Sequence, residues 1–278
     1  MRPFRQVNVF SAEGYLGNPL AVVHDAEGVS EEEMHRFANW TNLSETTFLL
    51  PPTDPAVADF RVRIFTPSEE LSFAGHPTIG SVHAWLEAGG VPRHEGEVVQ
   101  ECPAGLVRVR RGERLAFAAP PVVREGPVTG DERAQLARAL ALAEDDIVEA
   151  RWIDNGPGWV GVLLRDAAAV LAVRPDWSAF GDLEVGVVGA YPEGADCAVE
   201  VRAFCPSIGV VEDPVTGSLN ASIGQWLADD RLPTSYVASQ GTVLGRRGRV
   251  HVDRDADGTV WVGGDATTAI KGTVALGA

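Results

Sequence analysis

The amino-acid sequence predicts a mixed α and β fold built as two similar halves. The 278 residues exceed the roughly 100 to 200 residues of a typical single domain, so two domains are expected. Short stretches that alternate apolar and polar residues recur along both halves, with helical patterns between them. A glycine-containing turn that leads into a helix of small residues occurs once in each half, around Gly75 and around Gly217.

The first half, residues 1–118, is expected to consist of short strands and two helices. One helix covers 30–41, where Ser30 precedes three glutamates and so resembles a capped helix start. A second covers 78–88 and ends at a pair of glycines. The predicted strands cover residues 4–10, 21–24, 47–50, 60–65, 97–100, 106–110 and 115–118.

The second half, residues 119–264, opens with Pro120 and Pro121 and a connection that carries glycine and proline. A helix is expected at 131–142, where acidic residues occupy the first turn and Leu136 and Leu140 share one face. Another is expected at 218–228, after the small-residue turn at Gly217. The final strand, within 265–278, is expected to return to the first half. The predicted strands cover residues 147–153, 159–164, 185–188, 197–204, 235–240, 249–252, 260–263 and 268–276.

Composition and charge limit the possible partners. The chain is 45% hydrophobic and 22% charged, as in ordinary folded proteins. A net charge of −16 repels phosphate backbones and anionic lipids, so neither nucleic acid nor a membrane is expected as a partner. The first ten residues alternate like a strand rather than a signal peptide, and we expect a cytoplasmic protein.

No motif for a metal or cofactor stands out. Three cysteines, Cys102, Cys197 and Cys205, lack CxxC spacing, and the six histidines are scattered. No GxGxxG follows directly on the first strand, and the sequence contains no P-loop, HExxH or GxSxG motif. We therefore expect neither a metal nor a cofactor.

The two helix-start turns are candidate anion sites. A first turn built from Gly, Ser and Thr leaves backbone N–H groups at the positive helix end, where a carboxylate is favoured. Gly75 and the pair Gly217 and Ser218 are thus candidate substrate-binding residues. The alternative is that the two glycines only permit tight turns.

Three titratable side chains accompany these turns. His76 follows Gly75 and precedes Pro77. Proline suits the first helical position because it has no N–H to lose. Asp213 precedes the second turn, where its alternative role is helix N-cap. Glu45 begins an apolar strand, where desolvation favours a general acid or base, although most such glutamates are solvated.

Five blocks of sequence, in order along nearly the whole chain, resemble the PhzF family of phenazine biosynthesis isomerases. They are Gly17 to Val23, Asn42 to Phe48, Arg63 to Pro67, Glu70 to Gly80 and Gly209 to Ser218. The resemblance implies the α+β diaminopimelate epimerase-like fold, in which two pseudo-symmetric halves each wrap a mixed sheet around a central helix. It also implies a homodimer and an active site between the halves.

For the catalytic residues, the resemblance implies that Glu45 removes a proton from C3 of trans-2,3-dihydro-3-hydroxyanthranilate and returns one at C1. His76 and Asp213 would orient the substrate. Ser218 and the amides of Gly75 and Gly217 would bind its polar and anionic groups. The physical requirement is a carboxylate that accepts a proton beside donors that stabilise the resulting charge.

Two other functions stay open. One is a racemase or dehydratase of a hydroxy-amino acid, although the paired cysteines of the family's epimerase relatives are missing from both turns and Cys205 lies outside them. The other is a non-catalytic protein that binds small carboxylates. The aligned Glu45, His76 and Asp213 favour the isomerase, which would act on a small cyclic or amino carboxylate.

Overall fold

The computed structural model describes residues 1–277, which divide into two compact units. The N-terminal unit comprises residues 1–118 together with 263–278, and the C-terminal unit comprises residues 119–262. Within the part of the chain that is described, no helix is long and apolar enough to span a membrane.

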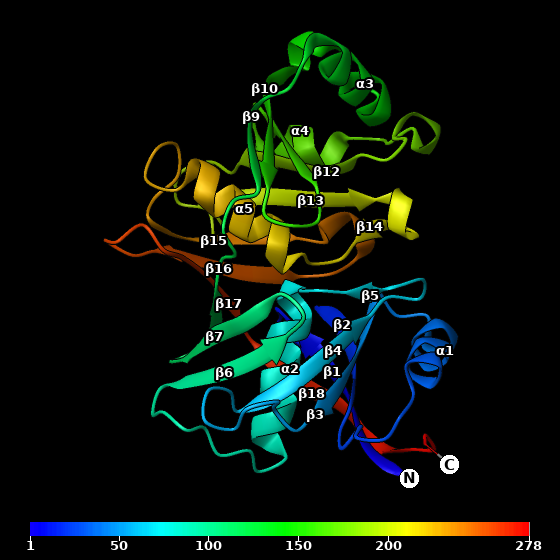
Figure 1. The fold of residues 1–278 in the computed structure, drawn as a ribbon. Helices are drawn as coiled ribbons and strands as arrows, with labels where there is room; N and C mark the ends of the chain where they lie inside the picture. Colours follow the sequence, from blue (N-terminus) through cyan, green and yellow to red (C-terminus); the bar gives the residue numbers. More distant parts are fainter. Residues whose placement is uncertain (278) are drawn as a thin grey trace. The chain divides into compact units, whose positions relative to one another are not determined.

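In the N-terminal unit a mixed sheet surrounds the helix α2 (Gly75–Glu87), as Figure 1 shows in cyan. From Gly75 to Val82 every residue of α2 is buried. The second helix, α1 (Glu31–Thr41), packs against β3 and β4. The strands are β1 (Arg2–Val9), β2 (Asn18–Val23), β3 (Glu45–Leu50), β4 (Phe60–Phe65), β5 (Glu70–Leu71), β6 (Glu97–Cys102), β7 (Gly105–Arg111), β8 (Leu115–Ala118) and β18 (Ala266–Val274).

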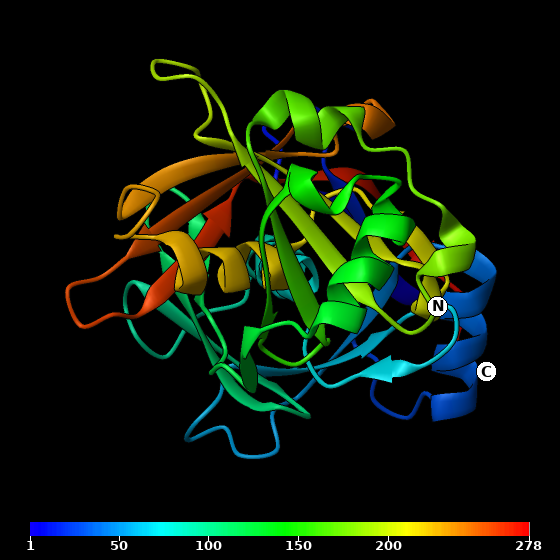
Figure 2. The same ribbon diagram turned by 90° about the horizontal axis from the view of Figure 1, so that it is seen from above.

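In the C-terminal unit the central helix is α5 (Gly217–Leu227), which contacts β10, β11 and β16. Figure 2 shows α3 (Gly130–Leu140) and α4 (Ala167–Ala172), both green, above the strands of this unit. The strands are β9 (Arg124–Pro127), β10 (Ile147–Asp154), β11 (Trp159–Leu164), β12 (Glu184–Ala190), β13 (Val199–Cys205), β14 (Val210–Asp213), β15 (Ser235–Gln240), β16 (Gly248–Arg254) and β17 (Val260–Gly264), whose last two residues belong to the N-terminal unit. Single 3₁₀ turns occupy Glu144–Asp146, Trp177–Ala179, Pro206–Ile208 and Thr242–Leu244.

The two units repeat one pairing order. In the N-terminal unit β1 to β4 pair antiparallel, parallel and antiparallel in turn, and β4 then pairs antiparallel with β5 and parallel with β6. In the C-terminal unit β10 to β13, with β14 and β15, follow the same sequence of directions. The predicted α+β fold of two similar halves, each wrapped around a central helix, is confirmed.

Close packing explains the small residues of both central helices. A Cβ added to Gly80 of α2 would lie 2.5 Å from the Leu20 side chain of β2. A Cβ added to Gly224 of α5 would lie 2.8 Å from the Val252 side chain of β16. Glycine at these positions lets the helix approach its sheet, and larger residues would force the two apart.

Most predicted elements are present, with differences at their ends. The strands predicted at 60–65, 115–118, 159–164 and 235–240 have the bounds expected. The helix predicted at 78–88 begins earlier, at Gly75, and the one predicted to reach residue 142 ends at Leu140, because Ala141 has φ of 52° in the left-handed region. The short β5, β9, β14 and α4 were missed, since two to six residues show no clear periodicity.

Candidate active site

Glu45 is the first residue of β3 and follows the turn that ends α1. That turn contains Asn42, whose φ of 54° reverses the chain direction after the helix. Within the sheet, Glu45 lies opposite Leu20 of the parallel strand β2. Its side chain is only 13% exposed. The carboxylate is therefore held by rigid sheet structure in a mainly dry environment.

His76 lies in the first turn of α2 with its ring against Glu45. The distance from Nε2 of His76 to Oε2 of Glu45 is 3.3 Å. Burial lowers the pKa of His76 to about 3, since a charged imidazolium would lose its hydration there. At neutral pH the ring is thus neutral, and its contact with Glu45 is not an ion pair.

Asn18 completes this group from the start of β2. Its Nδ2 lies 3.2 Å from Nδ1 of His76, and its Oδ1 accepts a hydrogen bond of 3.2 Å from the hydroxyl of Ser44. Asn18 is fully buried. Neither Asn18 nor Ser44 was singled out from the sequence as a site residue, although both lie in sequence blocks that resemble the PhzF family.

The N-terminus of α2 has no side-chain cap. Its N-cap residue is Ala74, whose methyl group cannot accept a hydrogen bond, and its first turn contains no acidic residue. Gly75 is the first helical residue, so Pro77 is the third and not the first as we expected. The positive end of this buried helix is suited to an anion.

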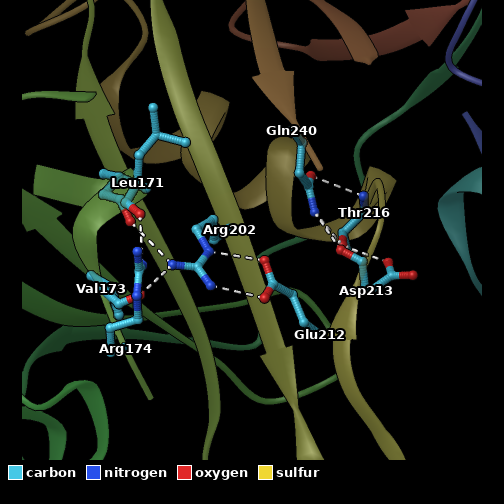
Figure 3. A network of polar contacts seen from close by, with 9 residues as sticks. Leu171, Val173, Arg174, Arg202, Glu212, Asp213, Thr216 and Gln240 are labelled. Carbon is cyan, nitrogen blue, oxygen red and sulfur yellow. Dashed lines mark hydrogen bonds and ion pairs between the residues drawn. The ribbon is translucent and has the colours of Figure 1, made fainter. Parts of the chain in front are cut away.

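Asp213 belongs to a buried polar network at the start of α5, shown in Figure 3. Its Oδ2 accepts a hydrogen bond of 2.6 Å from the hydroxyl of Thr216. Gln240 of β15 accepts from the backbone N–H of Thr216 and donates to both the Thr216 hydroxyl and the Asp213 carbonyl. Thr216 is the N-cap residue, so the alternative role of Asp213 as N-cap is wrong.

Ser218 follows Gly217 in the first turn of α5. Its hydroxyl oxygen accepts a hydrogen bond of 3.1 Å from the indole N–H of Trp159, and its carbonyl accepts one of 3.0 Å from the side-chain amide of Asn155. Because the indole can only donate, the Ser218 hydroxyl keeps its own proton for another acceptor, such as a bound carboxylate. Neither Trp159 nor Asn155 was singled out from the sequence.

A second buried carboxyl, Glu184, begins β12 just as Glu45 begins β3. It lies beside Trp159 in the parallel ladder and accepts hydrogen bonds from Ser207 and from the thiol of Cys205. Burial is the largest cause that raises its pKa. This contact explains the position of Cys205, whose role the sequence left open.

The structure therefore distributes the six predicted site residues over two places. Glu45, Gly75 and His76 lie together in the N-terminal unit, at the start of α2. Asp213, Gly217 and Ser218 lie together in the C-terminal unit, at the start of α5. Within residues 1–277 no group of three or more His, Cys, Asp or Glu side chains is arranged to hold a metal ion.

Comparison with known proteins identifies the family. The family model described as "Phenazine biosynthesis-like protein" (PhzC-PhzF) matches residues 7–272. The chain is 39% identical to antisense-enhancing sequence 1 of Schizosaccharomyces pombe, over 97% of each chain. It is 33% identical to the trans-2,3-dihydro-3-hydroxyanthranilate isomerase of Pseudomonas aeruginosa, over 93% of this chain and 92% of that one.

A solved structure supports the same conclusion at the level of fold. The PhzF family protein of Bacillus anthracis superimposes with a TM-score of 0.85 over 99% of both chains, at 23% sequence identity. Several relatives are named isomerases, including the Pseudomonas aeruginosa enzyme and YddE of Escherichia coli. The chain belongs to the phenazine biosynthesis-like family of PhzF isomerases.

Proposed function

We propose that this isomerase moves a proton on a small cyclic or amino carboxylate, with trans-2,3-dihydro-3-hydroxyanthranilate as the first candidate substrate. The substrate is the one named for the Pseudomonas aeruginosa relative. The observation that carries the proposal is the 3.3 Å approach of His76 Nε2 to the largely buried carboxyl group of Glu45. This short distance supports a role for the neutral His76 ring beside the single group that we propose as base and acid.

In the proposed reaction Glu45 removes the proton from C3 of the substrate and returns a proton at C1. One carboxylate serves both steps, so the protein ends the cycle in the protonation state in which it began. His76 and Asp213 orient the substrate by hydrogen bonding. The hydroxyl of Ser218 and the backbone amides of Gly75 and Gly217 bind its polar and anionic groups, as favoured at uncapped helix N-termini.

No step of this proposal uses a metal or a cofactor. Proton transfer between two carbons of a conjugated carboxylate needs only a base, an acid and donors for the charge that develops. We further propose that the protein works as a cytoplasmic homodimer, and light scattering on the purified protein would measure the dimer directly.

The test is proton exchange in deuterated water. We expect the chelator-treated protein to consume the candidate substrate and to introduce deuterium at C1, as followed by NMR. Glu45→Gln should lower kcat by at least about 100-fold, because the amide cannot accept the proton. Glu95→Gln, at an exposed position of the same unit, is the matched control and should retain full turnover.

Other results would contradict the proposal at defined points. Full turnover by Glu45→Gln would show that another group is the base. Exchange of the α-proton on hydroxy-amino acids, without turnover of the candidate substrate, would indicate a racemase or dehydratase. Tight binding of small carboxylates without any exchange would indicate a binding protein.

A further inference from the structure

We propose that Asn18 is a positioning residue that holds His76 in the tautomer with its proton on Nε2, so that the ring donates toward Glu45. The proposal deepens the function proposed above and rests on it for its catalytic consequence. Its structural part, the tautomer of His76, stands on the contacts among Asn18, Ser44 and His76 alone.

The Asn18 amide presents its oxygen to Ser44 and its NH₂ group to His76. The Ser44 hydroxyl donates to Oδ1 of Asn18 at 3.2 Å, so the NH₂ group of the amide is directed at His76. The distance from that Nδ2 to Nδ1 of His76 is 3.2 Å. An amide NH₂ can only donate, so Nδ1 must offer its lone pair, and the proton of a neutral ring then resides on Nε2.

Burial disfavours a second proton on the His76 ring, so the ring remains one of the two neutral tautomers. His76 is 3% exposed and Asn18 is fully buried. A doubly protonated ring would also turn an N–H against the NH₂ of Asn18, which has no lone pair to offer. The ring therefore stays neutral, and its two nitrogens keep different roles.

The tautomer decides what faces Glu45. With the proton on Nε2, a donor faces Oε2 of Glu45 at 3.3 Å, although the contact does not have hydrogen-bond geometry in this structure. With the proton on Nδ1, the same contact would bring a lone pair to the carboxylate, which is repulsive. Catalytic contacts often tighten when substrate binds, and the proposal expects this contact to do so.

The backbone around Asn18 makes this arrangement rigid. Asn18 is the first residue of β2 and pairs with Val9 of β1 in the antiparallel ladder. His76 is fixed in the first turn of α2. Because both residues belong to regular elements of one unit, the amide and the ring cannot easily separate.

The test measures the tautomer of His76 by NMR. Protein labelled with ¹⁵N at histidine is studied by two-bond ¹H–¹⁵N correlation, in which the two neutral tautomers give different patterns. His76 is assigned by the signal lost in His76→Gln. His83, whose Nε2 contacts the Thr268 hydroxyl at 3.1 Å, serves as an internal reference that should not change.

The test compares the native protein with the variants Asn18→Asp and Asn18→Ala. The native protein should show the Nε2–H tautomer. Asn18→Asp offers only acceptors to Nδ1, so it should convert His76 to the Nδ1–H tautomer and lower kcat by at least about 100-fold, with KM changed by less than about threefold. Asn18→Ala, which introduces no charge, should give a mixture of tautomers and an intermediate kcat.

Asn39→Asp is the matched control, because it makes the same substitution at an exposed residue of α1 and should change neither readout. An Nδ1–H tautomer in the native protein would overturn the proposal. So would an unchanged tautomer in both Asn18 variants, or a converted tautomer with unchanged kcat. If the native protein leaves the candidate substrate untouched, the proposed substrate fails, while the spectra still decide the role of Asn18.

Discussion

At the scale of single residues, burial rather than charge determines the state of the site. His76 is kept neutral beside the carboxylate of Glu45 because desolvation outweighs the attraction that an imidazolium would gain. Burial raises the pKa of Glu184 and so favours its neutral acid form. Both effects follow from one rule, since each group is pushed toward its uncharged state.

The buried histidines should make the folded state less stable in acid. His76 has a folded pKa of about 3 and His24 of about 4, both lowered from 6.5 mainly by burial. Below about pH 6.5 the unfolded chain therefore binds more protons, and stability falls as pH falls toward the folded pKa. Between about pH 7 and pH 4.5, His76 alone should account for a loss of about 2 to 3 kcal/mol.

Urea unfolding at a series of pH values measures this effect. In His76→Gln the free energy of unfolding should fall less steeply with falling pH, by a slope that corresponds to about one proton fewer taken up on unfolding. The substitution His94→Gln, at an exposed position, is the control and should leave this slope as in the native protein. An equally steep dependence in His76→Gln would show that this ring is protonated in the folded state.

At the scale of elements, the two units repeat an ion pair at matching strand positions. Arg63 of β4 makes two hydrogen bonds to Glu70 of β5, and Arg202 of β13 makes two to Glu212 of β14. Each arginine also lies over a phenylalanine two residues later on its own strand, at 5.1 Å and 4.9 Å from the ring centroid. The pairs join the short strands β5 and β14, which precede the central helices, to their sheets.

The two ion pairs differ in burial, so we expect them to contribute differently to the free energy of unfolding. The Arg202 and Glu212 side chains are 3% and 8% exposed, against 24% and 26% for Arg63 and Glu70. Arg202 also donates to the carbonyls of Val170 and Val173, as Figure 3 shows for Val173. Its charge is therefore held in the interior and depends on Glu212 for compensation.

We expect Glu212→Gln to lower the free energy of unfolding by about 3 kcal/mol, because it leaves a buried charge without its partner. Glu70→Gln, at the matching position, should cost about 1 kcal/mol, since solvent screens Arg63. Chemical denaturation of both variants checks the difference. Equal losses would mean that burial does not control the strength of this repeated pair.

At the scale of the whole molecule, the N-terminal unit is built from both ends of the chain. Strand β18 pairs antiparallel with β1 from Val274 opposite Arg2 to Ala266 opposite Val9. The C-terminal unit, in contrast, is a continuous segment, residues 119–262. The N-terminal unit therefore cannot complete its sheet until the last strand has been synthesised.

Removal of β18 should thus affect the N-terminal unit specifically. A chain ending at Gly264 should lose the β1–β18 ladder, and we expect hydrogen exchange in residues 1–118 to rise strongly while residues 119–262 keep most of their protection. A chain ending at Val274, which retains β18, is the control. Uniform protection in the shorter chain would show that β18 is dispensable.

Several features could be predicted from the sequence because they depend on neighbouring residues. Strand alternation, helix spacing and the Ser30 cap identified most elements, and the blocks around Glu45 and His76 identified the family. Short elements such as β14 escaped prediction because they are too brief to show a period. The N-cap role considered for Asp213 failed because Thr216 lies closer to the helix start.

The sequence by itself determined the class of fold, the family and the candidate residues at the two helix starts. Only the tertiary structure decided their partners. Asn18 meets His76 across 58 residues of sequence, and Trp159 meets Ser218 across 59. The physical reason is that periodicity and capping are local, whereas a buried polar group takes its hydrogen-bond partner from whichever element the fold packs against it.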